Sequence, residues 1–273
     1  MRWTAAVDPA WSLDAWRTRA RHAWAARIAP EAVDWRDDPG AGLLQGTDVD
    51  AAPPVRGGLR VPGRFLDLAS AVLCHRDPGR HGLLYRVLCR LGDGEAGLLE
   101  RATDPDVHRL DRLARAVRRD THKMKAFVRF RAIAREHDAF AAWFEPEHLI
   151  VDRVAPFFVR RFAGMRWSIL TPYRSAVWDG AQLWMGAGGR RDDVPAEDAG
   201  ESLWKTYYAN IFNPARLNLR MMRQEMAQKY WKLLPETDLL PDLVRDAGRR
   251  VQAMADRAPE APRRRIPRRQ QGK

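Results

Sequence analysis

The dipeptide Asp179-Gly180 constrains the fold most, because strand-like runs flank it on both sides. Ala176–Trp178 precedes it and Gln182–Met185 follows it, and apolar residues predominate in both runs. An Asp-Gly pair favours the tight turn of a β-hairpin, since both residues tolerate the backbone angles that the turn needs. The stretch therefore predicts two neighbouring antiparallel strands.

Three further strand-like segments place this hairpin in a larger sheet. They are predicted at residues 125–131, 140–144 and 167–170. A helix from Glu145-Pro146 to about Phe162 separates the second segment from the third. The order strand, strand, helix and three strands predicts an α+β protein, with an antiparallel sheet of about five strands flanked by many helices.

The helical spacing of apolar residues predicts most of the remaining secondary structure. A long helix begins with Asp104 as the N-cap and Pro105 in the first helical position. Four cations lie on its outer face: Arg112, Arg115, Arg118 and Arg119. Further helices are predicted at residues 9–29, 63–73, 83–91, 198–212, 213–231 and 239–254.

Shifts in composition divide the chain into four parts. Residues 36–62 are rich in Gly, Pro and Asp, and they predict a loop or linker between an N-terminal helical arm (1–35) and a single α+β domain (63–247). Residues 248–273 contain nine Lys/Arg against two Asp/Glu. This basic tail is predicted to be disordered and to bind nucleic acid without sequence preference.

Overall charge and cysteine content indicate which partner and which cellular compartment suit the protein. The net charge of +12 suits an acidic partner such as DNA, and 45% hydrophobic residues allow a sizeable core. The two cysteines, Cys74 and Cys89, form no CxxC motif and are predicted to be small buried side chains. No run is apolar enough for a membrane span or a signal peptide. The sequence therefore predicts a cytoplasmic protein with no membrane partner, no metal and no cofactor.

The stretch Thr121–Arg131 combines basic residues with a strand-like alternation. Period two places Lys125, Phe127, Arg129 and Arg131 on one face, and Ala126, Val128 and Phe130 on the other. Cations around an aromatic ring can bind phosphates and stack a base. The predicted nucleic-acid-binding residues are Arg118, Arg119, Lys123, Lys125, Phe127, Arg129, Arg131 and Trp143. Two alternatives are the solvated face of a sheet and arginines that pair with Glu145, Asp152 or Asp179.

A second candidate site lies at the predicted junction between a strand and a helix. Glu145, Glu147 and His148 could act as acid and base or could ligate a metal. The alternative is ordinary capping at the start of a helix, where acidic residues are favourable. The sequence supplies no second cluster to complete a site, so these three residues are weak catalytic candidates.

Several long motifs resemble a bacterial family of DNA-metabolism proteins that contain a domain of unknown function. They are RVPGRFLDLA, LLYRVLCRL, RRDTHKMKAFVRFR, AAWFEPEH, PFFVRRFAGMRWSILTPYRSAVWDG, YYANIFNPARLN and MAQKYWKLLPET. The resemblance covers about residues 10–255, with the motifs in the family's order. Cys89 and Ala227 stand where the family pattern has Trp and Pro.

The resemblance implies a role in DNA repair but brings no established catalytic residue. Members of this family occur alone or fused to a UdgX-type uracil-DNA glycosylase domain, and they are typically paired with a radical-SAM DNA modification or repair protein. This sequence contains neither the glycosylase domain nor radical-SAM cysteines, so such chemistry would belong to a partner.

The leading hypothesis is a DNA-associated accessory protein that binds DNA through a basic helix–sheet surface. One alternative is a base-processing enzyme that uses Glu145, Glu147 or His148, with Trp143 as a stacking surface. The second alternative is a protein–protein adaptor.

Overall fold

The computed structural model describes residues 2–37, 46–133, 138–195, 228–246 and 249, and the chain forms two compact units, residues 1–196 and 197–273. The α-helices of the first unit are α1 (Leu13–Ala25), α2 (Gly63–Val72), α3 (Arg80–Gly92), α4 (Pro105–Phe127) and α5 (Val151–Arg161). Its strands are β1 (Trp3–Ala6), β2 (Val33–Arg36), β3 (Thr47–Asp48), β4 (Arg131–Ala132), β5 (Ala139–Trp143), β6 (Arg166–Leu170), β7 (Arg174–Trp178) and β8 (Leu183–Ala187). Short 3-10 helices form at Pro30–Ala32, Val49–Ala51, Leu98–Glu100 and Arg191–Asp193.

The N-terminal residues form a parallel sheet that the sequence does not predict. Its strand order is β2-β1-β3, and Ala5 of β1 pairs with Trp35 of β2. Trp35 packs toward α1 and α3, with ring centroids 6.2 Å from Trp16 and 5.5 Å from Tyr85. These strands have only four, four and two residues, which is too short for a clear period-two pattern. One of them, β3, lies inside the predicted linker, while the predicted boundaries at 35, 62 and 247 remain predictions.

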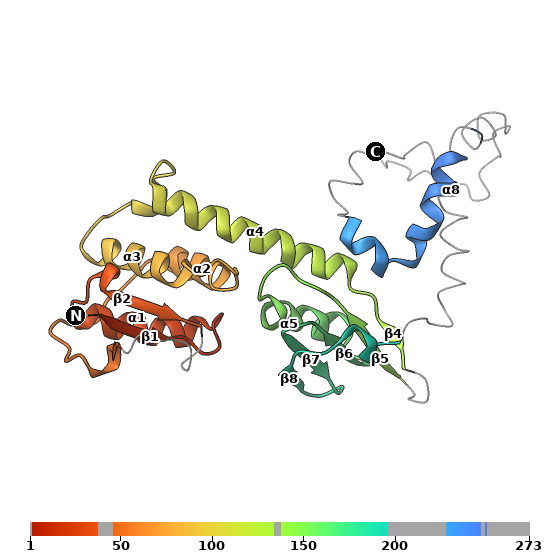
Figure 1. Ribbon diagram of the computed structural model, residues 1–273, viewed down its shortest axis with the longest axis horizontal. Helices are drawn as coiled ribbons and strands as arrows, with labels where there is room; N and C mark the ends of the chain where they lie inside the picture. The colour runs from red at the N-terminus through yellow and green to blue at the C-terminus, as the bar shows by residue number, and fades with distance from the viewer. Residues whose placement is uncertain (1, 38–45, 134–137, 196–227, 247–248, 250–273) are drawn as a thin grey trace, which may run out of the picture. The chain divides into compact units, whose positions relative to one another are not determined.

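Helices α2 and α3 each pack against α4, as their apolar stripes require (Figure 1). The predicted start of α4 is confirmed, because the Asp104 side chain accepts hydrogen bonds from the backbone N–H groups of Asp106 and Val107. Both cysteines are buried near this helical layer, as predicted, and burial raises the pKa of Cys74 and of Cys89 to about 11. No helix in the described ranges is long and apolar enough to cross a membrane.

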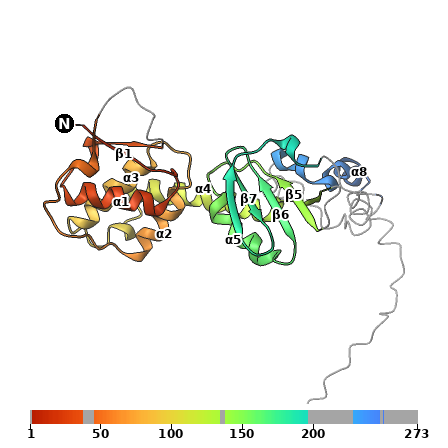
Figure 2. The ribbon, with the colours of Figure 1, turned by 90° about the horizontal axis from the view of Figure 1, so that it is seen from below.

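The larger sheet has five strands in the order β4-β5-β6-β7-β8 (Figures 1 and 2). The predicted hairpin is confirmed, because β7 and β8 are antiparallel and Gly180 in their turn has a φ of +102°. The prediction of a purely antiparallel sheet is wrong, because β5 and β6 are parallel. Helix α5 connects these two strands, and such a crossover returns the chain to the edge from which it started. The α+β class is confirmed by six described α-helices and two sheets.

One face of the five-stranded sheet packs against α5 in an aromatic core. Trp167 of β6 is 2% exposed, and its ring centroid lies 6.2 Å from Phe158 of α5 and 5.8 Å from Phe130. Register places Ala132, Phe140, Trp178 and Leu183 in the same row as Trp167, and therefore on the same face.

The predicted strand at residues 125–131 is wrong over its first half. Helix α4 continues to Phe127, and only Arg131 and Ala132 pair as a strand. The helical spacing of buried residues continues through Val117 and Met124 to Val128, and this packing outweighs the period-two alternation. Ala126 is consequently exposed, so it does not share the buried face that the alternation predicts for it with Val128 and Phe130.

The described part of the second unit is short. It contains 3-10 helices at Gln228–Leu233 and Pro235–Leu239, followed by α8 (Leu240–Arg245), with Tyr230 and Leu243 buried. The helix predicted at 239–254 therefore corresponds in part to α8. The helix predicted at 198–212, most of that at 213–231 and, apart from Arg249, the predicted disordered tail lie outside the described residues.

Candidate nucleic-acid interface

The outer face of α4 is the most strongly basic surface that the sequence predicts. Residues 112–133 contain eight Lys or Arg and a single acidic residue, Asp120. That acid points inward and is only 2% exposed. The face toward solvent contains the exposed residues Arg112, Arg115, Arg118, Arg119, His122 and Lys125. We call these six residues the basic face of α4.

Helical geometry aligns most of these side chains along one side of α4. Positions three and four residues apart are neighbours on a helix, so Arg112, Arg115, Arg119 and His122 form a stripe of about 15 Å. Among the described residues, Arg112, Arg118 and Arg119 form no ion pair, whereas the Arg115 Nε donates to the carbonyl oxygen of Asp111. The stripe therefore presents guanidinium groups to solvent from a rigid helix.

The remaining predicted cations do not continue this stripe as a sheet face. The Lys125 Nζ lies 4.9 Å from the ring centroid of Phe157. Arg129 Nη1 donates to the carbonyl oxygen of Ala126 at 2.9 Å, and Arg131 Nη1 donates to that of Pro195 at 2.9 Å. The Lys125 contact therefore joins α4 to α5, Arg129 bonds back to the last turn of α4, and Arg131 joins β4 to Pro195.

The two predicted stacking residues also lie apart from the predicted arrangement. Phe127 is half-buried in the last turn of α4, where positions two apart diverge by about 200°. Lys125 and Phe127 therefore cannot form the predicted face of cations around one ring. Trp143 lies in β5, and its Nε1 donates to the Glu145 Oε1 at 2.9 Å. Lys123 is half-buried on α4.

The predicted acidic junction is anchored by Asp120 and His75, which are not among the residues predicted for either site. The buried Asp120 Oδ2 accepts a hydrogen bond of 2.8 Å from the His148 backbone N–H. The His148 ring is buried and stacks on His75, with centroids 4.1 Å apart and planes 32° apart. The His75 Nδ1 accepts from the Asp77 N–H at 2.9 Å. Burial lowers the pKa of His75, which favours the neutral ring with its proton on Nε2.

The two glutamates of the junction are exposed, unlike His148. The Glu145 side chain accepts from Trp143, and the backbone carbonyl oxygen of Glu147 accepts from Arg76 Nε at 3.0 Å. The backbone contacts of the junction connect β5 and α5 to the α2–α3 turn. A catalytic role for Glu145, Glu147 or His148 remains a prediction.

Residues 78–236 match a family described as a domain of unknown function, DUF4130. The chain belongs to the DUF4130 family. No curated protein and no solved structure matches the chain. The matched residues of this DUF4130 protein include the whole of α4, the acidic junction and the five-stranded sheet, whereas the N-terminal parallel sheet precedes them.

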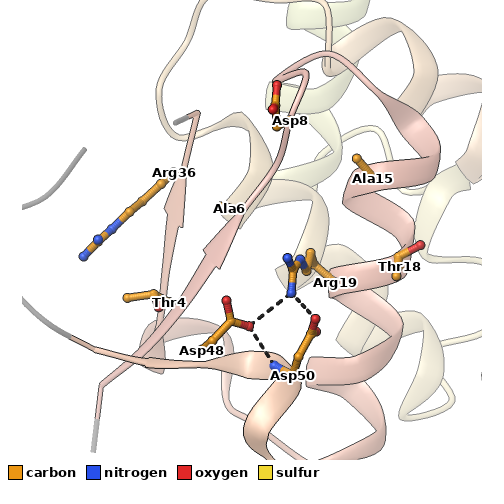
Figure 3. Close-up of a pocket in the computed structure, with 9 residues that line it drawn as sticks. All are labelled: Thr4, Ala6, Asp8, Ala15, Thr18, Arg19, Arg36, Asp48 and Asp50. Atoms are coloured by element: carbon orange, nitrogen blue, oxygen red, sulfur yellow. Dashed lines mark hydrogen bonds and ion pairs between the residues drawn. The ribbon is translucent and has the colours of Figure 1, made fainter. Parts of the chain in front are cut away.

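A pocket of about 410 Å³ lies beside the N-terminal sheet of the DUF4130 protein (Figure 3). Arg19 Nη1 lies 3.1 Å from the Asp48 Oδ1 and also pairs with Asp50. Three carboxylates (Asp8, Asp48 and Asp50) line the pocket with two guanidinium groups (Arg19 and Arg36). This excess of negative charge repels phosphate, so the pocket is a poor nucleic-acid site.

Alanine substitutions in the junction test whether it is catalytic. Glu147→Ala should change the free energy of unfolding by less than about 0.5 kcal/mol, because the side chain is exposed. His148→Ala should cost about 1–3 kcal/mol, because it removes a buried, stacked ring. If the junction is catalytic, both variants will lose base-directed activity while Glu147→Ala melts normally. A loss confined to His148→Ala, in step with its unfolding, would identify a structural role.

Proposed function

We propose that this DUF4130 protein is an accessory factor in DNA metabolism or repair that binds nucleic acid through the basic face of α4. A radical-SAM or glycosylase-type protein would supply the chemistry. The observation that supports nucleic-acid binding is the basic face of α4, where Arg112, Arg118 and Arg119 are exposed while Asp120, the acid next to Arg119, is buried. The resemblance in sequence to DNA-metabolism proteins supports the repair role and the partner.

The chemistry of this face favours contacts with phosphates over contacts with bases. Arginine presents a planar fork of N–H donors that matches phosphate oxygens. Each phosphate that is neutralised releases condensed counterions, which gives affinity without sequence preference. The DUF4130 protein should therefore bind many sequences with similar affinity and a strong dependence on salt.

Replacing Arg118 and Arg119 with glutamine tests this proposal. The double variant should bind a DNA oligonucleotide about tenfold more weakly, and its plot of log K against log salt should be less steep by up to about 1.8. Fluorescence anisotropy over a range of salt concentrations measures both quantities. The comparison is made with the full chain and with a chain that lacks residues 248–273, because the basic tail should add its own salt-dependent contacts.

The matched control replaces Arg64 of α2 and Arg86 of α3 with glutamine, which also removes two positive charges. These two arginines are exposed but pair with Glu100 and Asp106. Their substitution should leave the salt dependence close to that of the unmodified protein. Equal losses from both double variants would show that only overall charge matters. Undetectable DNA binding by the unmodified chain would favour the protein-adaptor interpretation.

A further inference from the structure

Two apolar side chains are exposed together on the hairpin of the five-stranded sheet. Trp184 of β8 is 54% exposed and Val177 of β7 is 41% exposed. The two residues are directly paired across the strands, so their side chains lie side by side on one face. Register places Ser168, Ala141 and Arg131 in the same row. Because Trp167 and its row face α5, this is the opposite face of the sheet.

The indole of Trp184 is held by the hairpin turn. Its Nε1 donates to the Asp179 Oδ2 at 3.0 Å, and the Asp179 Oδ1 accepts from the backbone N–H groups of Ala181 and Gln182. These bonds lower the pKa of Asp179, so the acceptor is ionised at neutral pH. A ring fixed at one edge loses little further freedom when a flat ligand stacks on it.

The surroundings of Trp184 suit a nucleobase attached to an anionic backbone. The next position in the row holds the small, half-buried side chain of Ser168, which leaves room beside Val177, whereas Ala141 beyond it is buried. Arg166, two residues before Ser168 on the same strand and face, is exposed. Arg166 can contact a phosphate and the exposed indole of Trp184 can stack a base, so a single strand of nucleic acid offers both groups that this face can bind.

We infer that Trp184 and Val177 form a base-stacking platform for single-stranded nucleic acid. The inference rests on the proposed function and specifies its ligand, because bases in a duplex already stack on one another and cannot place a face on the indole. The platform and the basic face of α4 contribute different kinds of energy. Stacking depends little on salt, whereas phosphate contacts weaken as salt rises.

Substitution of Trp184 in the full-length protein separates these contributions. Trp184→Ala should weaken binding to an oligothymidylate about tenfold, while the slope of log K against log salt stays unchanged. Trp184→Phe should retain most of the affinity, because a phenyl ring still stacks. Binding to an abasic oligonucleotide of the same length should be the same for Trp184→Ala and the unmodified protein, because phosphates are present but bases are absent. Val55→Ala, which alters another exposed apolar residue, should change nothing.

Several results would overturn the platform. They are an unchanged affinity of Trp184→Ala for oligothymidylate, an equal loss on the abasic strand, and a changed salt slope in a variant that still melts normally. A shift from dimer to monomer on Trp184→Ala, measured by light scattering, would assign the surface to a second copy of the chain. If Arg118 and Arg119 prove dispensable while Trp184→Ala weakens binding only to strands with bases, the α4 interface fails and the platform stands.

Discussion

Replacing Arg80 with methionine should lower the free energy of unfolding by about 3–5 kcal/mol, because several acceptors lose their donor at about 1–3 kcal/mol each. The Arg80 side chain is 1% exposed, and it donates to Asp37 at 2.9 and 3.0 Å. It also donates to the carbonyl oxygens of Leu73, Asp77 and Ala10. Methionine has a similar length but no donor, so the buried carbonyl oxygens of Leu73 and Ala10 lose a donor, and Asp37, whose side chain is 54% exposed, loses its guanidinium partner. Denaturant titration followed by circular dichroism measures the loss.

Arg86 on the same helix provides the matched control for Arg80. Its side chain is 47% exposed and forms a bidentate pair with Asp106, and exposed pairs contribute about 1 kcal/mol or less. Arg86→Met should therefore be far milder than Arg80→Met. Arg80→Lys should fall between them, because an ammonium group keeps the charge but cannot reach all the acceptors of the guanidinium fork. Equal destabilisation by the two methionine variants would disprove the central role of Arg80.

The sequence predicts best those helices and hairpins whose ends contain a capping residue or a turn glycine. Asp104 caps α4 with its carboxylate, and Gly180 adopts the positive φ that the β7–β8 turn requires. Both effects depend on residues within a few positions of each other, so a single sequence contains the whole signal. The α+β class follows from such local elements.

Features that depend on long-range pairing were not predicted. The parallel pairing of β5 with β6 had one usable signal, the helix predicted between them, because a helical crossover favours parallel strands. The N-terminal sheet offered no such signal in strands of two to four residues. After Val117, the helical spacing of apolar residues overlaps with the period-two alternation of a strand. The chain stays helical there because Met124 packs in the core.

In the candidate interface too, the sequence predicts features that depend on nearby residues and not those that depend on distant ones. Arg118 and Arg119 were identified correctly as outer-face residues of a helix, because their exposure follows from the apolar stripe opposite them. Asp120 was not identified, since its partner is the backbone N–H of a residue 28 positions away. A lone acid on the inner face of a basic helix is the signal that could have found it, because a buried carboxylate needs a donor.

Asp120→Ala should be the second most destabilising change among those considered, at about 2–4 kcal/mol. The Asp120 carboxylate is 2% exposed and accepts from the His148 N–H at 2.8 Å. Alanine leaves this buried N–H without its charged acceptor. The next residue, Leu149, still donates its N–H to the carbonyl oxygen of Cys74 at 2.8 Å. Loss of protection should therefore centre on the His148 amide, which hydrogen–deuterium exchange can measure alongside denaturant unfolding.

Substitution of Asp111 on the same helix is the control that distinguishes loss of the Asp120 hydrogen bond from loss of a negative charge on α4. Asp111→Ala also removes one carboxylate from α4, but at a half-buried position, and should change stability by about 0.5 kcal/mol or less. Asp120→Asn keeps an acceptor oxygen and should recover part of the loss. Because Asp120 faces inward, away from Arg118 and Arg119, folded Asp120→Asn should keep the salt dependence of DNA binding. Unchanged exchange at His148 in Asp120→Ala would show that this bond does not anchor the junction to α4.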